Sequence, residues 1–207
     1  MGKQMAFYVN QQVCMGCKTC QVSCKDKNDL KVGQLWRRVY EVEGGGYSVV
    51  GDAVYSDVQA YYLSISCNHC QDAPCVKNCP TGAMTKRAED GVVFVDQSLC
   101  IGCRYCSWAC PYGAPQFNPD SGKMRKCDFC LDLQQKEQPP ACVESCPVRA
   151  LEYGPLDELQ KKHPDATAAL KGLPDPSLTK PSVLYSPHRH AFTAGPVPSL
   201  TGDGERR

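Results

Sequence analysis

Apolar residues in this chain gather in short stretches that are typical of β-strands. FYVN at 7–10 and VVFV at 92–95 are two such stretches, and YSVV, AVYSDV and AYYLSIS follow one another between residues 47 and 66. Residues 81–98, TGAMTKRAEDGVVFVDQS, hold a Glu-Asp-Gly turn between two short runs, which predicts a β-hairpin. We therefore expect small sheets built from short strands.

The second half of the chain is predicted to contain less regular structure. Residues 131–141 are polar and end in two prolines, which predicts a surface loop. A short helix is predicted over residues 155–170, weakened by Pro164. Residues 173–207 are rich in proline, and two interpretations of this tail stay open: a solvated end, or an arm laid along a partner subunit.

Sixteen cysteines among 207 residues change this picture. That content is close to the fraction at which a chain is held together by covalent links rather than by an apolar core. The N-terminal MGKQMAFYVN lacks the features of a secretory signal, which argues against disulfides. A formal charge of +1 gives no indication of a nucleic-acid partner, and without a run of about 18 apolar residues we do not expect the chain to cross a membrane by itself.

The cysteines fall into four groups of four, with none left over. The 42 residues between the first and second groups include three consecutive glycines and the strand-like pieces at 47–66, which predicts an inserted sheet or connector packed by Trp36 and the tyrosines. The groups, in chain order, are Cys14, Cys17, Cys20, Cys24; Cys67, Cys70, Cys75, Cys79; Cys100, Cys103, Cys106, Cys110; and Cys127, Cys130, Cys142, Cys146.

The four groups are related in pairs, as expected for an internal repeat. FYVNQQVCMGCKTCQVSC at 7–24 matches VFVDQSLCIGCRYCSWAC at 93–110 with identical cysteine spacing. The second and fourth groups form another pair, which differs by seven extra residues between the second and third cysteine. The chain is therefore interpreted as a duplicated two-group unit.

The spacing C-x2-C-x2-C-x3-C followed by proline is that of bacterial ferredoxins, in which the fourth cysteine binds a neighbouring 4Fe-4S cluster. Three thiolates on such a loop can hold three corners of a cubane, and Gly16 or Gly102 lets the loop turn. Zinc would account for isolated C-x2-C pairs but would not call for C-x2-C-x2-C. Cysteines three apart rarely form disulfides with each other, so four 4Fe-4S clusters on sixteen cysteine ligands are favoured.

Other residues near the cysteines have secondary roles in this interpretation. His69 is predicted to donate a hydrogen bond or to pack beside a cluster, because the thiol set is already complete. Tyr105 and Trp108 would shield a cluster or face a partner. Basic side chains would offset the negative charge of the clusters: Lys18, Arg104 and Lys126.

Residues 7–159 resemble the four-cluster iron–sulfur subunits of molybdopterin oxidoreductases, and among these the electron-transfer subunits of anaerobic dimethyl sulfoxide reductases. The likeness rests on CMGCKTCQVSCKD, YYLSISCNHC, CPTGAM, CIGCRYCSWACPYGAPQ and CVESCPVRALEYGP. The resemblance implies an α+β fold with two bacterial ferredoxin-like modules, an inserted small β element and an extended C-terminal tail. One module would comprise residues 1–35 and 120–155, the connector 36–66, the other module 67–119, and the tail 156–207.

The resemblance also implies how the cysteines are shared among clusters. The residues alone allow other pairings of the groups, and only the predicted hairpin between the second and third groups gives independent support. The implied ligand sets are a first set of Cys14, Cys17, Cys20 and Cys146; a second of Cys24, Cys127, Cys130 and Cys142; a third of Cys67, Cys70, Cys75 and Cys110; and a fourth of Cys79, Cys100, Cys103 and Cys106.

Two positions distinguish this chain, one from the ferredoxin motif and the other from a related branch of the family. Lys25 stands where proline follows the last cysteine of the other three groups, so the exit of the first group should take a different path. Relatives in respiratory nitrate reductase carry tryptophan at the position of Cys103 and hold a three-iron cluster there, so cysteine here argues for four irons.

By resemblance, the chain is a non-catalytic electron-transfer subunit. It would relay electrons from an integral membrane anchor that oxidises quinol to a molybdopterin-containing catalytic subunit of an anaerobic respiratory reductase. It would lie at the cytoplasmic membrane within a heterotrimer, either exported folded with the catalytic subunit or on the cytoplasmic face. The alternatives are a soluble polyferredoxin, or the iron–sulfur subunit of a formate dehydrogenase or of a polysulfide, thiosulfate or arsenate reductase.

Overall fold

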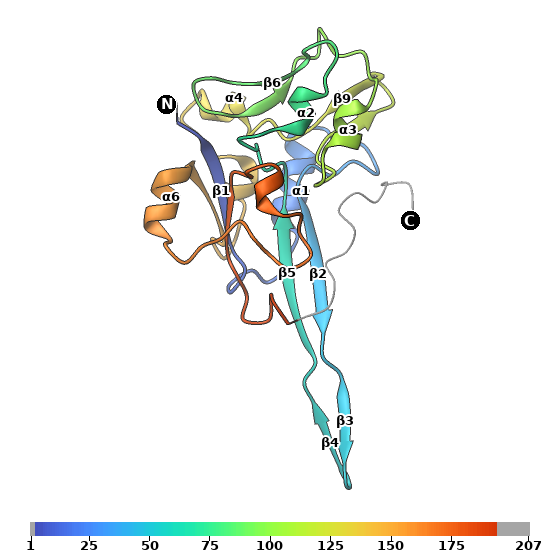
Figure 1. Cartoon of the computed structure of the whole chain (residues 1–207), viewed down its shortest axis with the longest axis vertical. Helices are drawn as coiled ribbons and strands as arrows, with labels where there is room; N and C mark the ends of the chain where they lie inside the picture. Colours follow the sequence, from blue (N-terminus) through green and yellow to red (C-terminus); the bar gives the residue numbers. More distant parts are fainter. Residues whose placement is uncertain (1–2, 194–207) are drawn as a thin grey trace.

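The computed structural model describes residues 3–193, and they form an α+β fold of short elements around a central three-stranded sheet (Figure 1). The middle strand of this sheet is β1 (Met5–Asn10), paired antiparallel with β10 (Leu151–Pro155) and parallel with β11 (Val183–Ser186). Phe7 and Val9 pack into the largest apolar cluster, while Tyr8 packs on the other side. Because both faces of β1 are covered, its continuous apolar sequence AFYV fits a central strand.

The cysteine-bearing segments form two similar arrangements of helices and strands. In one, α1 (Thr19–Lys27) packs against α5 (Ala141–Glu144), which leads into β10. In the other, α3 (Tyr105–Ala109) packs against α2 (Pro74–Lys77), which leads into the hairpin of β6 (Met84–Lys86) and β7 (Val93–Val95). The hairpin predicted at 81–98 is therefore confirmed. A further hairpin, β8 (Gln116–Asn118) with β9 (Lys123–Arg125), lies at the same end of the molecule as α3 (Figure 1).

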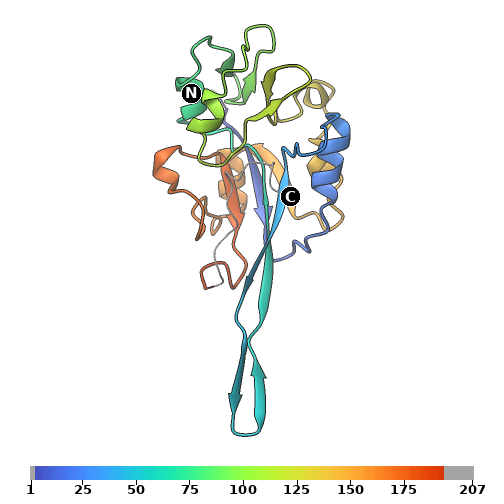
Figure 2. The same cartoon turned by 90° about the vertical axis from the view of Figure 1, so that its right-hand side faces the viewer.

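The predicted connector is a long two-stranded ribbon, which protrudes from the body in Figures 1 and 2. Strands β2 (Arg38–Gly44) and β5 (Gln59–Ile65) pair antiparallel within and at the edge of the body. The ribbon continues as β3 (Tyr47–Val50) and β4 (Ala53–Ser56), and we call residues 45–58 the arm. Trp36 and Tyr61 are buried beside the base of the ribbon, as predicted, whereas Tyr47 and Tyr55, also expected to pack the connector, are exposed.

The first cysteine group leaves its helix by a different path from the other groups, as predicted from Lys25. Helix α1 continues through Cys24 to Lys27, whereas α3 ends at Ala109, before its last cysteine. The Lys25 ammonium donates to the carbonyl oxygens of Leu30 at 2.6 Å and Lys31 at 2.5 Å, which fixes the turn after the helix.

Two expectations for the second half of the chain are confirmed only in part. The helix expected over 155–170 is α6 (Leu156–Lys162), which ends before Pro164 because the residue preceding a proline avoids helical geometry. The segment 131–141 is not loop throughout, since it begins with α4 (Leu131–Gln134) and only its later part is irregular.

The tail expected to be a solvated end or an arm on a partner instead packs on the body as far as residue 193. Its 3-10 turn η1 (Pro176–Leu178) precedes β11, and Tyr185 on that strand is completely buried. The remainder of the predicted tail, residues 194–207, lies outside the described residues. Within residues 3–193 no helix is long and apolar enough to cross a membrane.

Candidate metal centres

The four thiols of the fourth set line one hollow near the end of the molecule formed by α3 and the β8–β9 hairpin. Apolar side chains from β6, β7 and β9, including Met84, Val95 and Met124, form its walls. Its outer rim is exposed, since Ile101 on the cysteine loop is 67% accessible and Trp108 on the adjoining helix α3 is 74% accessible. The hollow lies between the thiols of Cys79, Cys100, Cys103 and Cys106.

A second hollow lies deeper, between α2 and the chain that leaves α3. Its walls include Val93, Tyr112 and the buried Lys126. The last cysteine of the third group, Cys110, lines this hollow and not the one formed by the rest of its group. The lining thiols are those of the third set, Cys67, Cys70, Cys75 and Cys110.

A third hollow lies at the base of the ribbon. Val39 of β2 and Ser64 of β5, which are cross-strand partners, form part of its wall. Met15 and Cys17 on its rim are exposed. Its thiols are those of the first set, Cys14, Cys17, Cys20 and Cys146, so the structure brings together cysteines from opposite ends of the sequence.

The thiols of the second set lie close together and are all buried. Cys24 interacts electrostatically with Cys142 and Cys130, and Cys127 interacts with Cys24 and Cys130. Burial and these neighbouring thiols raise the pKa of Cys24 to about 12. The first and fourth cysteine groups therefore meet twice, once in the hollow of the first set and once in the second set. This agrees with the packing of α1 on α5.

The two C-x2-C-x2-C loops have the same backbone conformation. Gly16 and Gly102 have φ of 69° and 70°, and the residues that precede their helices, Lys18 and Arg104, have φ of 60° and 65°. A side chain at Gly102 would place its Cβ 2.1 Å from the carbonyl oxygen of Gly122. Glycine is thus required at this position both by the left-handed conformation and by the close approach of the neighbouring backbone.

Hydrogen-bond donors point at cysteine sulfur atoms. The backbone N–H of Met84 donates to Cys79 Sγ at 3.3 Å, and that of Ala150 donates to Cys146 Sγ at 3.3 Å. The N–H of Met124 lies 3.4 Å from Cys100 Sγ. Such donors stabilise sulfur that carries negative charge, and they are one of the means by which proteins set cluster potentials.

Most of the buried thiols are poor acids in the absence of a cation. Burial raises the pKa values of Cys20, Cys70 and Cys110 above the ordinary thiol value. On the exposed rim, by contrast, hydrogen bonds from Thr19 lower the pKa of Cys17. Coordination to metal deprotonates a thiol outright, so metal ions would remove the obstacle that burial imposes.

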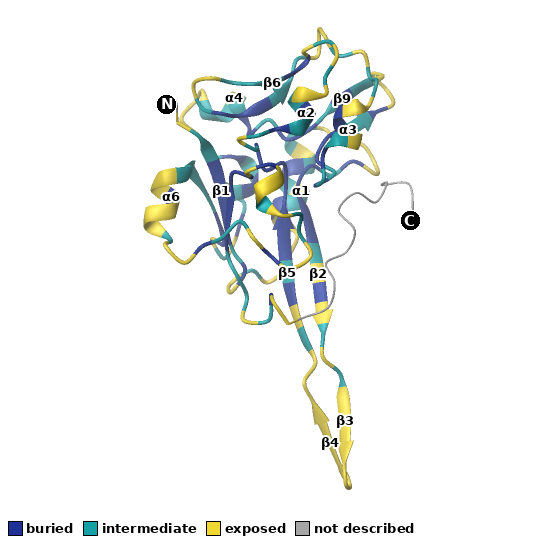
Figure 3. Cartoon of the chain, in the orientation of Figure 1, coloured by how far each residue is buried: buried dark blue, intermediate teal, exposed yellow. Residues whose placement is uncertain are grey.

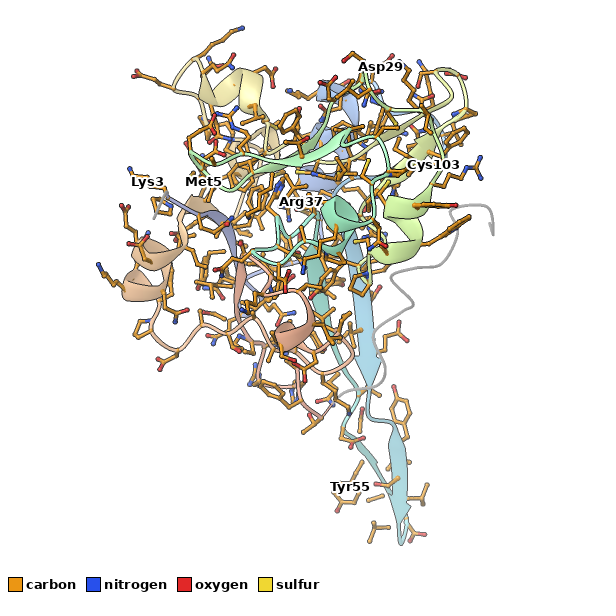
Figure 4. The ribbon with its side chains drawn as sticks, turned by 45° about the horizontal axis from the view of Figure 1, so that its top comes forward. Lys3, Met5, Asp29, Arg37, Tyr55 and Cys103 are labelled. Atoms are coloured by element: carbon orange, nitrogen blue, oxygen red, sulfur yellow. The ribbon has the colours of Figure 1, made fainter. Side chains whose placement is uncertain are left out.

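Arg37 is a fully buried cation among these thiols, and no sequence pattern pointed to it. Its guanidinium donates to Ser64 Oγ at 3.1 Å and Ser66 Oγ at 3.0 Å and lies 4.8 Å from the centre of the Phe7 ring. Burial itself lowers the pKa of Arg37, but the thiols of Cys142 and its neighbours raise it overall. Figure 4 shows Arg37 in the middle of the body and Cys103 near α3.

Two residues expected near the clusters are buried between the two arrangements. Lys126 donates to the carbonyl oxygens of Val93 and Cys127 and lines the hollow of the third set. His69 is fully buried, and its Nδ1 accepts from the N–H of Val93 at 3.0 Å. Burial, and to a lesser extent the positive charge of Lys126, lowers the pKa of His69. This imidazole is therefore neutral, and it packs between the two arrangements.

The donor sets fit iron–sulfur clusters. Each of three hollows is lined by four thiols and otherwise mainly by apolar side chains, and the second set supplies four more buried thiols. Within residues 3–193 no three His, Cys, Asp or Glu side chains are arranged to hold a single metal ion. Cysteine thiolates are the usual ligands of 4Fe-4S clusters.

Residues 58–156 match the family model of the 4Fe-4S dicluster domain. The protein is therefore an iron–sulfur electron-transfer protein with several 4Fe-4S clusters.

Comparison with curated proteins narrows this class. The chain is 51% identical over 195 residues to a chain of the anaerobic dimethyl sulfoxide reductase of Escherichia coli (strain K12), with 94% of each sequence covered. It is 44% identical to the corresponding anaerobic dimethyl sulfoxide reductase chain from Haemophilus influenzae, over 97% of this sequence and 98% of that one. It is 43% identical to the thiosulfate reductase electron transfer subunit of Salmonella typhi, over 75% of this sequence and 78% of that one. The chain belongs to the family of iron–sulfur subunits of anaerobic dimethyl sulfoxide reductases.

Proposed function

We propose that this chain relays electrons through four 4Fe-4S clusters from a quinol-oxidising membrane anchor to a molybdopterin catalytic subunit, and that it performs no bond chemistry itself. The observation that carries the proposal is the presence of sixteen thiols in four sets of four. When bound, such clusters accept and donate single electrons. The chain's own residues hold them apart, bury them and supply hydrogen bonds and positive charge around them.

The ligand sets are proposed as the family resemblance implies. Support comes from the placement of the last cysteine of each group beside three cysteines of another group. The sets are Cys14, Cys17, Cys20 and Cys146; Cys24, Cys127, Cys130 and Cys142; Cys67, Cys70, Cys75 and Cys110; and Cys79, Cys100, Cys103 and Cys106.

The same pairing supports two ferredoxin-like modules, one of residues 1–35 with 120–155 and the other of 67–119. The ribbon of the 36–66 connector joins them, and 156–207 is an appended segment. The packing of α1 on α5 and of α3 on α2 is what two such modules require.

The exposed rims of the first and fourth sets suit them to exchange electrons with other proteins. Met15 and Cys17 are accessible at the first set, and Ile101 and Trp108 at the fourth, whereas the second set is buried throughout. We assign the first set to the molybdopterin subunit and the fourth set to the membrane anchor. The chain would then lie at the cytoplasmic membrane as part of a heterotrimer, on either face.

Iron and acid-labile sulfide analysis of anaerobically prepared protein tests the number of clusters. Four 4Fe-4S clusters require about sixteen iron and sixteen sulfide per chain. Iron well below that number contradicts the proposal. A colourless protein that contains zinc would indicate that the cysteines hold zinc instead of iron–sulfur clusters. A chain that purifies alone with full iron, and that no molybdopterin subunit binds, would be a soluble polyferredoxin.

The assigned order of the clusters, with the fourth set at the membrane anchor, is tested with Cys103→Ser. We expect paramagnetic resonance to show that the fourth cluster is altered to a three-iron form, because one of its four ligands is lost. Quinol-driven turnover of the complex should stop, while the catalytic subunit remains active with artificial dyes. Normal quinol-driven rates in this variant would refute the assigned order.

A further inference from the structure

The arm is an unusual surface because it is apolar on both faces and covered on neither. Registered pairs share a face, so Tyr47, Val49 and Val54 lie on one side and Val50 and Tyr55 on the other. All are exposed, with Tyr47 at 75% and Val49 at 71% accessible, and Figure 3 shows the arm exposed along its length. A pair of strands at the surface of a protein normally has one apolar face and one polar face. A pair that is apolar on both faces is normally enclosed by other parts of the structure.

The charges of the ribbon define what could enclose it. Apart from Arg38, which is buried at the start of β2 and donates to the carbonyl oxygen of Tyr112, the ribbon carries only acidic charges: residues 39–71 contain Glu41, Glu43, Asp52 and Asp57 but no lysine or arginine. Within residues 3–193 none of these four acids forms an ion pair with a basic side chain. A second copy of the same ribbon would bring like charges together, so the matching surface is apolar with basic groups at its rim.

The position of the arm relative to the metal centres indicates which subunit carries that surface. Strands β2 and β5, which continue into the arm, also line the hollow of the first set through Val39 and Ser64. Tyr62 of β5 lies against Gly16 on the rim of that hollow. The hollow of the fourth set, by contrast, lies with α3 at the opposite end of the molecule (Figure 1).

The length of the ribbon adds a size requirement. At about 3.3 Å per residue, the tip at Gly51 lies roughly 40 Å from Val39 beside the hollow. A partner that covers the rim of the first set and the arm together must exceed the diameter of a small domain, which is about 30 Å.

We propose that the arm docks in a groove with apolar walls and a basic rim on the molybdopterin catalytic subunit. This inference rests on the proposed function, which places that subunit at the first set. The arm holds the exposed rim around Met15 and Cys17 against the catalytic subunit, because the two features share strands β2 and β5. The arm is thus a partner-binding element, and it takes no part in holding the clusters.

The test compares iron-loaded wild-type chain with two arm variants for binding to the purified catalytic subunit, identified by its bound pterin. The variants are Tyr47→Ser/Val49→Ser/Val54→Ser and Val50→Ser/Tyr55→Ser. A matched control, Val32→Ser/Leu178→Ser, removes exposed apolar side chains elsewhere. Iron content and paramagnetic resonance should be unchanged in all variants, since the arm is far from the hollows.

We expect the dissociation constant to rise at least tenfold in each arm variant and to stay within twofold in the control. Arm variants that bind within twofold of wild type overturn the arm proposal and leave the proposed function standing. A fully loaded wild-type chain that does not bind the catalytic subunit overturns both. Loss of self-association, or of binding to the membrane anchor alone, assigns the arm to another occupant and also overturns the proposal.

The charge argument is tested separately with Glu43→Gln/Asp52→Asn. We expect the association rate with the catalytic subunit to fall severalfold at low salt and to depend less on ionic strength than in wild type, because these acids steer the encounter. An association rate with unchanged salt dependence would overturn the assignment of a basic rim.

Discussion

Replacing Arg37 by glutamine should lower the reduction potentials of the clusters on the first and second sets while leaving the fourth almost unchanged. Ser64 Oγ lies 3.1 Å from the Arg37 guanidinium and 3.6 Å from Cys20 Sγ, so the cation lies within about 7 Å of that sulfur. It also interacts electrostatically with Cys24 and Cys142 of the second set. The largest electrostatic influences on Arg37 come from thiols of the first and second sets and not from those of the fourth.

The size of the effect follows from Coulomb's law. A unit charge about 8 Å from a cluster, at an effective dielectric constant of about 20, is worth about 2 kcal/mol. For a one-electron couple about 59 mV corresponds to a tenfold change in the equilibrium constant, or about 1.4 kcal/mol, so the shift is about 90 mV. The sign is negative, because a cation favours the reduced and more negative form of a cluster.

Redox titration followed by paramagnetic resonance of the reduced clusters measures this shift. Arg37→Lys is the matched control, since it keeps the charge and should change the potentials much less. The fourth cluster serves as an internal reference within the same sample. A uniform shift of all four clusters, or an Arg37→Lys variant that matches Arg37→Gln, would refute the reasoning.

Three further predictions concern stability and are measured by denaturant or thermal unfolding of the loaded protein. Gly102→Ala should lower the free energy of unfolding more than Gly82→Ala. Both glycines lie near φ +70°, so both substitutions share about 1–2 kcal/mol of left-handed strain, but only at Gly102 does the new Cβ meet backbone atoms. Equal losses in the two variants would contradict this. Tyr185→Ala should lower the free energy of unfolding by about 3–5 kcal/mol, whereas Phe192→Ala, at an exposed position, should leave it nearly unchanged. Burial raises the pKa of Glu152, but its basic neighbours on and just after α6 lower it overall. A lowered carboxyl pKa stabilises the fold above the unfolded value of about 4.3 and loses this effect as the pH falls. The melting temperature of Glu152→Gln should therefore lie below that of wild type near pH 7, where the clusters are stable, and the gap should narrow at high ionic strength because the ion pair is partly exposed; a gap that does not depend on salt would argue against the pair.

Local sequence signals predicted the parts of the fold that depend on local geometry. The hairpin between the second and third cysteine groups follows from a turn flanked by short apolar runs, and the structure has it as β6 and β7. The glycines in the two cysteine loops were expected from the need to turn around a cluster, and both have positive φ. The different exit after Cys24 followed from Lys25 in place of proline.

Contacts between distant residues could not be predicted in the same way. VLYS at 183–186 stands among prolines, and only its parallel pairing with β1, more than 170 residues earlier, makes it a strand. Arg37 is one of many basic residues in the sequence, and its burial among thiols depends on how four separate segments meet. Helix α6 stops earlier than expected because Pro164 prevails over the surrounding helix-forming residues.

The meeting of Cys20 with Cys146 in one hollow also has a consequence for how the protein is made. About 125 residues separate the two, so at roughly 5–20 residues per second the ribosome needs some 6–25 s to supply the second after the first. The thiols of the third and fourth sets, which span only residues 67–110, emerge together within that interval. The middle of the chain can thus acquire its iron while synthesis continues, and the N-terminal thiols must wait, reduced and unassembled, until more than two thirds of the chain has been made.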